Sequence, residues 1–327
     1  METFVSVSLV AIQLHHFDAH TNVRIAKSDV PDHMPTPTGM LLLLNAAAAL
    51  QLNIANAPPT TSPAGGAGVR AVTMKAVEPT REVGIHQGVE VEESGSFGTT
   101  EYSMRFKHAD GPTLSPWHDM PLRTREGWYN MLTEIPKMSR EKMEVATKVA
   151  GNPIMQDEKK GKARLYHGPI FWNYGCLPQT WEDPNVEGDA DVNGAFGDND
   201  PVDVVEIGAA ALEMGSFTPV KVLGCLSMID DGELDWKVIA ISAADKHATK
   251  INDVGDIEKY YPGTVSGIRE WFRWYKTPDG KPINGFGHGE RALSAAEAAD
   301  VIGQTHEHYL NLMAGHAEKG KLWLPDY

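Results

Sequence analysis

One short stretch limits what this chain can fold into more than any other, and it runs from Gly197 to Gly208 with the sequence GDNDPVDVVEIG. Three aspartates fall within six residues, and an apolar run follows them directly. Such a run favours a buried strand, whereas carboxylates enter a core only where a cation compensates their charge. Because Pro201 cannot donate to a sheet ladder, we expect it at the start of the strand. The stretch therefore predicts a strand whose first turn holds acids against a cation.

Side chains along that strand should alternate between two faces. Asp203, Val205 and Ile207 should point one way, and Val202 and Val204 the other. Asp203 is then expected at the polar mouth of an otherwise apolar face.

A second segment repeats this arrangement. Residues 221–229 and 235–242 predict two apolar strands, and the Asp-Gly pair between them favours a tight hairpin turn. On the second strand, Asp235 and Lys237 share a face with two isoleucines. Two faces that are polar at the mouth and apolar inside suggest a small barrel with a polar rim.

Other short strands are predicted before this barrel segment. They lie near 99–108, 131–135 and 142–145. We expect residues 150–163 to form a polar loop and residues 168–183, which are rich in Pro, Gly and aromatic residues, to form a rigid loop.

The predicted helices come late in the chain. Apolar residues recur at helical spacing from Ile268 to Tyr275. Ser294 and Glu297 form a capping box that opens a second helix, which Gly315 closes. Short strands followed by helices predict an α+β domain.

The first 75 residues differ in composition from the rest. Acidic residues are absent between Asp32 and Glu78. The leucine- and alanine-rich run in this part is too short and too polar to span a bilayer. We interpret residues 1–75 as a plastid targeting segment that is cleaved near Arg70, with a mitochondrial or cytoplasmic location as the alternative. A mis-assigned start codon or a disordered tail is a competing interpretation. Residues 76–327 are then expected to form a single domain.

The overall charge narrows the classes of partner. A formal charge of −15 argues against a protein that grips nucleic acid, because such binding needs clustered Lys and Arg. A polyanionic substrate remains possible where metal ions reverse the local field. Cys176 and Cys225 are the two cysteines, which provide neither a disulfide framework nor a zinc cluster and indicate a reducing compartment.

The acidic stretch could simply be a solvated turn, as Asp-rich segments often are. Against that, the acids adjoin buried strand residues, and the cations Lys142, Arg164 and Lys237 occur on neighbouring strands. Hard oxygen ligands without histidine or thiolate favour Mg²⁺ or Mn²⁺. Several such ions together with Lys and Arg describe a phosphoryl-transfer site.

Two other interpretations compete with an enzyme. An OB-type barrel could hold single-stranded nucleic acid on Trp172, Trp181 and Trp236, although the negative charge opposes this. Residues 189–200 imitate a calcium-binding loop, but Pro184 precedes them and a strand follows, where two helices are required.

The segment from Asp198 to Asp203 also resembles the D-x-D-P-x-D signature of family I soluble inorganic pyrophosphatases. The resemblance extends over roughly residues 95–315, is best to the eukaryotic branch, and keeps the order of the family's other motifs. Those motifs are matched by Glu134-Ile135-Pro136, Lys142-Met143-Glu144, Asn152-Pro153-Ile154, Gln156-Asp157, Asn173-Tyr174-Gly175, Pro178 to Pro184, Asp235-Trp236-Lys237 and Trp271 to Lys276.

This resemblance implies Mg²⁺-dependent hydrolysis of pyrophosphate to two orthophosphate ions, which draws biosynthetic reactions forward. It implies a closed five-stranded OB-type barrel with flanking strands and C-terminal helices. Asp198, Asp203 and Asp235 would bind the activating metal, and a water held between two ions would be the nucleophile. Asp200 would be the general base that takes its proton.

The resemblance also implies the remaining roles. Metals that arrive with the substrate would be held by Asp230, Asp235 and Glu144, with Glu134 supporting them through water. Mn²⁺ or Zn²⁺ are possible substitutes for Mg²⁺. The residues that would bind the phosphate oxygens are Lys142, Arg164, Tyr174, Lys237, Tyr275 and Lys276, with Tyr174 also assigned to catalysis.

The chain departs from the family pattern in two places. Members with a second tyrosine before Asn-Tyr-Gly carry it near Ile170, and its absence here leaves one hydroxyl contact with the substrate open. Lys137-Met138 replaces the Arg-Trp of dimeric fungal relatives, so monomer and homodimer both remain possible. The expected partners are pyrophosphate and phosphate, with no nucleic acid and no membrane.

Overall fold

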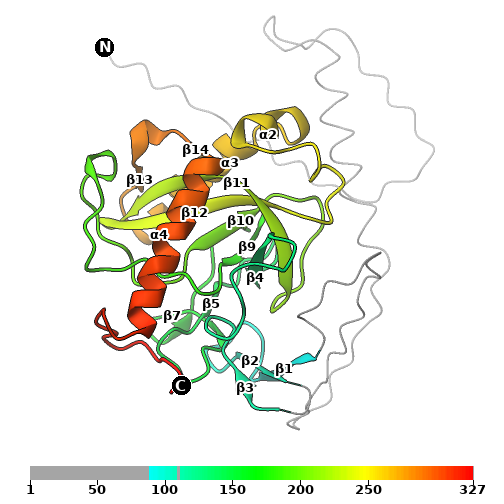
Figure 1. Cartoon of the computed structure of the whole chain (residues 1–327), viewed down its shortest axis with the longest axis vertical. Helices are drawn as coiled ribbons and strands as arrows, with labels where there is room; N and C mark the ends of the chain where they lie inside the picture. Colours follow the sequence, from blue (N-terminus) through cyan, green and yellow to red (C-terminus); the bar gives the residue numbers. More distant parts are fainter. Residues whose placement is uncertain (1–87, 109–110, 327) are drawn as a thin grey trace, which may run out of the picture. The chain divides into compact units, whose positions relative to one another are not determined.

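The computed structural model describes residues 88–108 and 111–326. The expected N-terminal extension, residues 1–75, lies outside the described residues. The described part is a sheet-rich α+β arrangement with its helices near the C-terminus (Figure 1), as the order of predicted elements indicated.

The first half of the described chain consists of short strands. They are β1 (Val89–Ser94), β2 (Ser103–His108), β3 (Thr113–Leu114), β4 (Tyr129–Ile135), β5 (Met143–Val145), β6 (Ile154–Gln156), β7 (Glu158–Lys159), β8 (Lys162–Ala163) and β9 (Asn173–Cys176).

Longer strands and the helices follow. They are the 3₁₀ helix η1 (Ala190–Val192), β10 (Asp203–Glu206), β11 (Phe217–Asp230), β12 (Glu233–Ser242), α2 (Val254–Tyr260), α3 (Thr264–Trp274), η2 (Thr277–Asp279), β13 (Gly285–Phe286), η3 (His288–Glu290), β14 (Leu293–Ser294) and α4 (Ala295–Met313).

In the larger sheet, five strands pair in a closed order, so that the last strand pairs with the first. β4 pairs with β9, β9 with β10, β10 with β12, and β12 with β11. The first residues of β11, Phe217–Val220, then pair with β4. β1, β2, β3, β5 and β6 form a second sheet, and β7 pairs with β8.

The predicted alternation along β10 and β12 is confirmed. Val205 and Ile207 pack in one apolar cluster together with Ile239 and Ile241 of β12. The intervening residues of both strands, Val202, Val204, Val238 and Ala240, pack in a different cluster on the other face. One face of each strand thus leads from the acids into the interior.

The hairpin between β11 and β12 forms where the Asp-Gly pair predicted it. Asp231 and Gly232 have φ values of 52° and 98°, which is the backbone conformation that a tight two-residue hairpin requires. This turn places Asp230 and Asp235 near the same end of the hairpin.

Two expected loops contain strands. Residues 150–163 include β6, β7 and β8, and residues 168–183 include β9, so both loop predictions are wrong in part. β9 is only four residues long and lies between β4 and β10, so its pairing partners make it a strand. Gly175 allows this close approach, because a Cβ there would lie 1.8 Å from the carbonyl oxygen of Leu132.

Both predicted helices are present. α3 buries Ile268 and Phe272, and α4 begins at the predicted capping box of Ser294 and Glu297. α4 packs across β11 (Figure 1). The sequence did not indicate the seven-residue α2. Among the described residues, no helix has the length and apolarity needed to cross a membrane.

Candidate active site

A cavity of about 310 Å³ gathers all thirteen residues that the sequence singled out. It lies at the polar mouth predicted for β10 and β12, and β5 and β9 also contribute to it. The thirteen are Glu134, Lys142, Glu144, Arg164, Tyr174, Asp198, Asp200, Asp203, Asp230, Asp235, Lys237, Tyr275 and Lys276. Segments more than a hundred residues apart in the chain therefore converge on one site.

The loop before β10 is fixed by its backbone. Asn199 adopts the left-handed conformation (φ 73°), and the N–H of Asp200 donates to Asp198 Oδ1 at 3.0 Å. Glu182 pairs with the loop on both sides, since its carbonyl accepts from Asn199 N at 2.9 Å and its N–H donates to the Asp200 carbonyl at 3.0 Å. A Cβ at position 197 would lie 2.5 Å from the Glu182 carbonyl, which explains Gly197.

A buried lysine lies at the centre of the site. Lys237 is 2% exposed, and its ammonium group donates to Asp203, to Asp235 and, at 3.1 Å, to the Tyr174 hydroxyl. The Tyr174 hydroxyl itself donates to Asp203. Although burial opposes it, Asp203 and Asp235 raise the pKa of Lys237 well above its ordinary value. Lys237 is therefore a permanent positive charge in the cavity.

Two further groups of cations flank it. Asp157 Oδ2 lies 2.9 Å from both Lys142 Nζ and Arg164 Nη1, and so holds these two cations side by side. Lys276 forms an ion pair with Asp230, whose Oδ2 also accepts from the Tyr275 hydroxyl at 3.2 Å. The site thus combines several cations with more acids than those cations can neutralise.

Three carboxylates with no sufficient countercharge meet at one side of the cavity. Oxygen atoms of Glu182, Asp198 and Asp235 all lie within 4.8 Å of one another. Glu182 is 3% exposed, and its Oε2 has no hydrogen-bond partner among the described residues. Burial and the Asp198 carboxylate raise the pKa of Glu182 well above its usual range, and burial and Asp235 do the same for Asp198.

Such a cluster is costly unless a cation joins it. The orphaned oxygen and the all-oxygen donor set fit a hard divalent ion such as Mg²⁺. The acidic groups of this chain could therefore bind a metal here.

Asp200 and Asp235 have pKa values near neutrality. Burial and the Glu144 carboxylate raise the pKa of Asp200 to about 6. Burial raises the pKa of Asp235 to about 7, although the Lys237 ammonium opposes the shift. A carboxylate with a pKa near the ambient pH is suited to exchange protons.

Glu134 has a different environment. It is 4% exposed, and its Oε1 accepts from the N–H of Val145 at 2.7 Å, which ties β4 to β5. Burial, and then the Asp203 carboxylate, raise its pKa well above the usual value. Glu134 therefore supports the wall of the cavity as well as lining it.

The sequence interpretation gave no role to several groups that the structure brings to the site. Tyr166 and Cys176 line the cavity, Asp157 links two of its cations, and Glu182 belongs to its carboxylate cluster. Tyr166 could have been found, because it lies two residues after Arg164. Ile170 is fully buried in the core. The tyrosines that line the cavity are Tyr166, Tyr174 and Tyr275.

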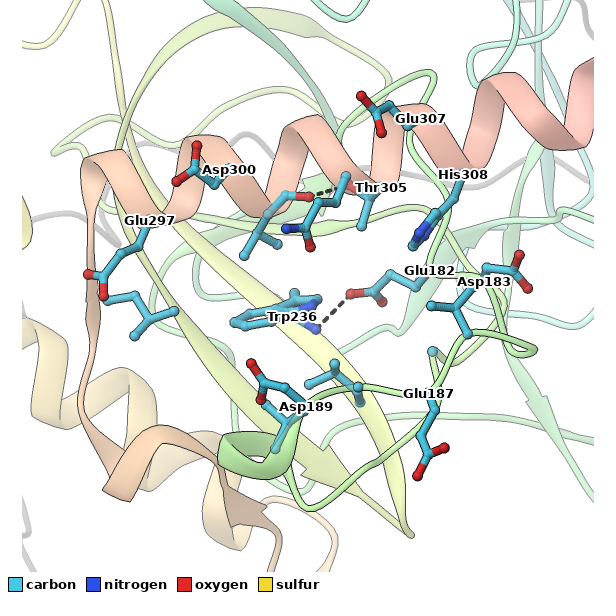
Figure 2. Close-up of a pocket in the computed structure, with 18 of the residues that line it drawn as sticks. Glu182, Asp183, Glu187, Asp189, Trp236, Glu297, Asp300, Thr305, Glu307 and His308 are labelled. Carbon is cyan, nitrogen blue, oxygen red and sulfur yellow. Dashed lines mark hydrogen bonds between the residues drawn. The ribbon is translucent and has the colours of Figure 1, made fainter.

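A second, larger cavity of about 510 Å³ shares Glu182 with the carboxylate cluster (Figure 2). Glu182 and Trp236 line it, and the backbone N–H of Trp236 donates to Glu182 Oε1 at 2.8 Å. Its other charged lining residues include Asp189, Asp300 and Glu307, and neither lysine nor arginine is among the described residues that line it. The smaller cavity contains four lysine and arginine side chains that could bind a polyanion, so it is the candidate active site.

The competing interpretations find no support in the geometry. Trp181 is fully buried and Trp172 is 8% exposed, so neither offers a stacking surface for bases. Trp236 is half-buried and lines the larger cavity, where the charged neighbours are acidic and would repel a phosphate backbone. The calcium-like segment contains the short 3₁₀ helix η1, and among the described residues it lacks the two flanking helices of such a loop.

Comparison with known proteins gives a consistent picture. A sequence model of the family described as inorganic pyrophosphatase matches residues 131–310. The chain is 51% identical to soluble inorganic pyrophosphatase 1, chloroplastic, of Chlamydomonas reinhardtii over 248 residues, which cover 76% of this chain and 85% of that protein. It is 47% identical to soluble inorganic pyrophosphatase 6, chloroplastic, of Arabidopsis thaliana over 256 residues, or 78% of this chain and 85% of that protein.

A solved structure is similar as well. The N-terminally truncated vacuolar soluble pyrophosphatase of Trypanosoma cruzi in complex with PPi superimposes with a TM-score of 0.66 at 40% identity. The match covers 72% of this chain and 96% of that one.

Proposed function

Since this chain belongs to the inorganic pyrophosphatase family and is an inorganic diphosphatase, we propose that it hydrolyses pyrophosphate in a Mg²⁺-dependent reaction with Asp200 as the general base. The observation that carries the proposal is the single cavity in which the buried carboxylates adjoin Lys142, Arg164, Lys237 and Lys276. Removal of pyrophosphate would draw the biosynthetic reactions that release it forward.

The acids would hold the metal ions. Asp198, Asp203 and Asp235 would bind the activating metal, with Glu182 beside them. Asp230 and Glu144 would hold ions that arrive with pyrophosphate, and Glu134 would support them. When bound, Mg²⁺ would neutralise phosphate charge and lower the pKa of the attacking water.

Asp200 would accept the proton of that water. Its carboxylate lines the cavity, and its pKa of about 6 lets it take a proton near neutral pH and release it again. Asp200 and Asp203 are three residues apart, so in a regular strand their side chains would point to opposite faces. Both line the cavity because the loop that ends at Pro201 changes the direction of the chain between them.

The cations and hydroxyl groups would hold the substrate. Lys142 and Arg164 would bind one phosphate, because Asp157 holds both cations in place. Lys276 and Tyr275 would bind the other, and Lys237 with Tyr174 would face the bridge between the two phosphates. These groups would neutralise the charge that develops on the leaving phosphate.

The first test is release of orthophosphate from pyrophosphate by the purified protein at neutral pH with millimolar Mg²⁺. The second is Asp200→Asn, which should lower kcat by about 100- to 1,000-fold, as removal of a general base does, while Mg²⁺ affinity stays nearly unchanged. Loss of Mg²⁺ affinity in Asp200→Asn would show that Asp200 is a ligand and that another group is the base.

We also propose that the circuit of β4, β9, β10, β12 and β11 is the closed five-stranded OB-type barrel expected from the resemblance. The pairing of each strand with its neighbours, ending with β11 on β4, supports this. Residues 76–327 would then be the catalytic domain that contains it.

The location of the protein is a separate proposal. We infer that residues 1–75 direct it to the plastid and are removed near Arg70, because two similar proteins carry the word chloroplastic in their names. Mass spectrometry of the mature protein should find an N-terminus near residue 70. An intact Met1 would contradict this, and import into mitochondria would favour the alternative.

A further inference from the structure

Asp200 is held firmly along its backbone, but its carboxylate needs an additional contact to be oriented. The Asp200 N–H and carbonyl are bound by Asp198 and by Glu182. These backbone bonds do not restrict rotation of the Asp200 carboxylate about its side-chain bonds. A general base must present one particular oxygen to the water that it deprotonates, so rotation of the carboxylate reduces the productive fraction.

Thr147 supplies a contact to this carboxylate. Its hydroxyl donates to Asp200 Oδ1 at 3.2 Å. In the stretches 88–108 and 111–326, no other side chain donates a hydrogen bond to this carboxylate. Thr147 is not among the residues that line the cavity, and its hydroxyl contacts the Asp200 carboxylate from outside it.

Thr147 is itself rigidly placed. It is 5% exposed and lies two residues after the end of β5. Its carbonyl accepts from Asn152 Nδ2 at 3.2 Å and from the backbone N–H of Trp323 at 2.9 Å, so the C-terminal segment and a buried asparagine both hold it. Asn152 is in turn fixed through its Oδ1, which accepts from Ser115 Oγ at 2.8 Å.

We propose that Thr147 is a positioning residue for the reaction: its hydroxyl occupies Oδ1 of Asp200 and so directs Oδ2 toward the attacking water. This rests on the proposed role of Asp200 as the base. It extends the active site to a residue outside the cavity and, through Trp323, to the C-terminal end of the chain.

The test compares Thr147→Val, which removes the hydroxyl and keeps the shape, with Thr147→Ser, which keeps the hydroxyl. Thr147→Val should lower kcat by about 10-fold with KM for pyrophosphate and Mg²⁺ affinity unchanged within about twofold, because orientation and not binding is lost. Thr147→Ser should recover kcat to within about threefold of the unmutated enzyme. Thr305→Val, a matched buried change on α4, should leave kcat unchanged.

A double-mutant cycle separates positioning from a general effect on the fold. If Thr147 acts through Asp200, Thr147→Val should cause no further loss of kcat in the Asp200→Asn background. Independent, multiplying losses would overturn the proposal. So would a Thr147→Val enzyme with unchanged kcat, or a Thr147→Ser enzyme as impaired as Thr147→Val. Absence of phosphate release from the unmutated protein would instead contradict the proposed function.

Discussion

Asp203 lies opposite Lys237 in the parallel register of β10 and β12, and the buried ammonium group of Lys237 donates to its carboxylate. The pairing of the two strands therefore places these two side chains next to each other. Because the same lysine also reaches Asp235 and Tyr174, it links three of the predicted site residues.

Replacing this lysine should damage both stability and turnover. In Lys237→Met, the buried Asp235 and the half-buried Asp203 lose their cation, so we expect a loss of about 3 kcal/mol in the free energy of unfolding without metal. Loss of a charge next to the substrate should also lower kcat by about 100-fold. Urea unfolding in EDTA and a phosphate-release assay measure these effects.

Lys281→Met is the matched control. Lys281 pairs with Asp231 at 2.9 Å on the surface, so its loss should cost less than about 1 kcal/mol. Equal losses of stability in the two variants would contradict the central role of Lys237.

Removing one acid from the carboxylate cluster should stabilise the metal-free protein. The raised pKa of Asp198 means that the folded state holds a proton which the unfolded state releases, so this group lowers stability as the pH rises through that raised value. Asp198→Asn should therefore raise Tm by about 2–4 °C at pH 8 in EDTA, which corresponds to about 1 kcal/mol.

With Mg²⁺, Asp198→Asn should have a lower Tm than the unmutated protein. The unmutated protein gains stability from the bound ion, whereas the variant has lost a ligand for it. Scanning calorimetry with and without Mg²⁺ checks both parts. An Asp198→Asn variant that is less stable than the unmutated protein in EDTA would show that the neighbouring carboxylates do not destabilise ionised Asp198.

Mg²⁺ binding should release protons. The pKa of about 7 for Asp235, one of the proposed ligands, means that this group is largely protonated at pH 6, and a metal must displace that proton. Affinity for Mg²⁺ should therefore rise between pH 5 and pH 8. Calorimetric titration in two buffers with different ionisation enthalpies measures the proton count, and a count of zero at pH 6 would contradict the assignment.

A histidine that does not line the catalytic cavity should control stability in acid. His118 is 3% exposed, its Nδ1 lies 3.1 Å from the Tyr309 hydroxyl, and its Nε2 lies 3.2 Å from the Trp323 carbonyl. Burial lowers the pKa of His118 to about 4. The unfolded state takes up a proton at higher pH than the folded state, so stability is lost as pH falls from about 6.5 to about 4.

The loss from this group should approach about 3 kcal/mol, since each pKa unit corresponds to about 1.4 kcal/mol. His118→Gln should be less sensitive to pH over this range. His316→Gln, at an exposed position, should behave like the unmutated protein. The measurement is urea unfolding at a series of pH values, and identical pH profiles for His118→Gln and the unmutated protein would refute the prediction.

Much of the fold was predictable because its signals are local. The alternation in residues 202–207, the Asp-Gly hairpin and the capping box at Ser294 each depend on neighbours within a few residues, and all three appear as expected. β9 was missed because a four-residue strand has too little periodicity of its own to show.

The candidate site divides in the same way. The sequence by itself determined the chemical groups: acids spaced as D-x-D-P-x-D, cations on nearby strands, and an apolar face beneath them. Only the tertiary structure decided which groups meet: Asp157 between Lys142 and Arg164, Glu182 against the loop before β10, and Thr147 on Asp200. Those contacts follow from strand register and from the backbone path between distant segments. Neither of these can be predicted from the spacing of residues along the chain.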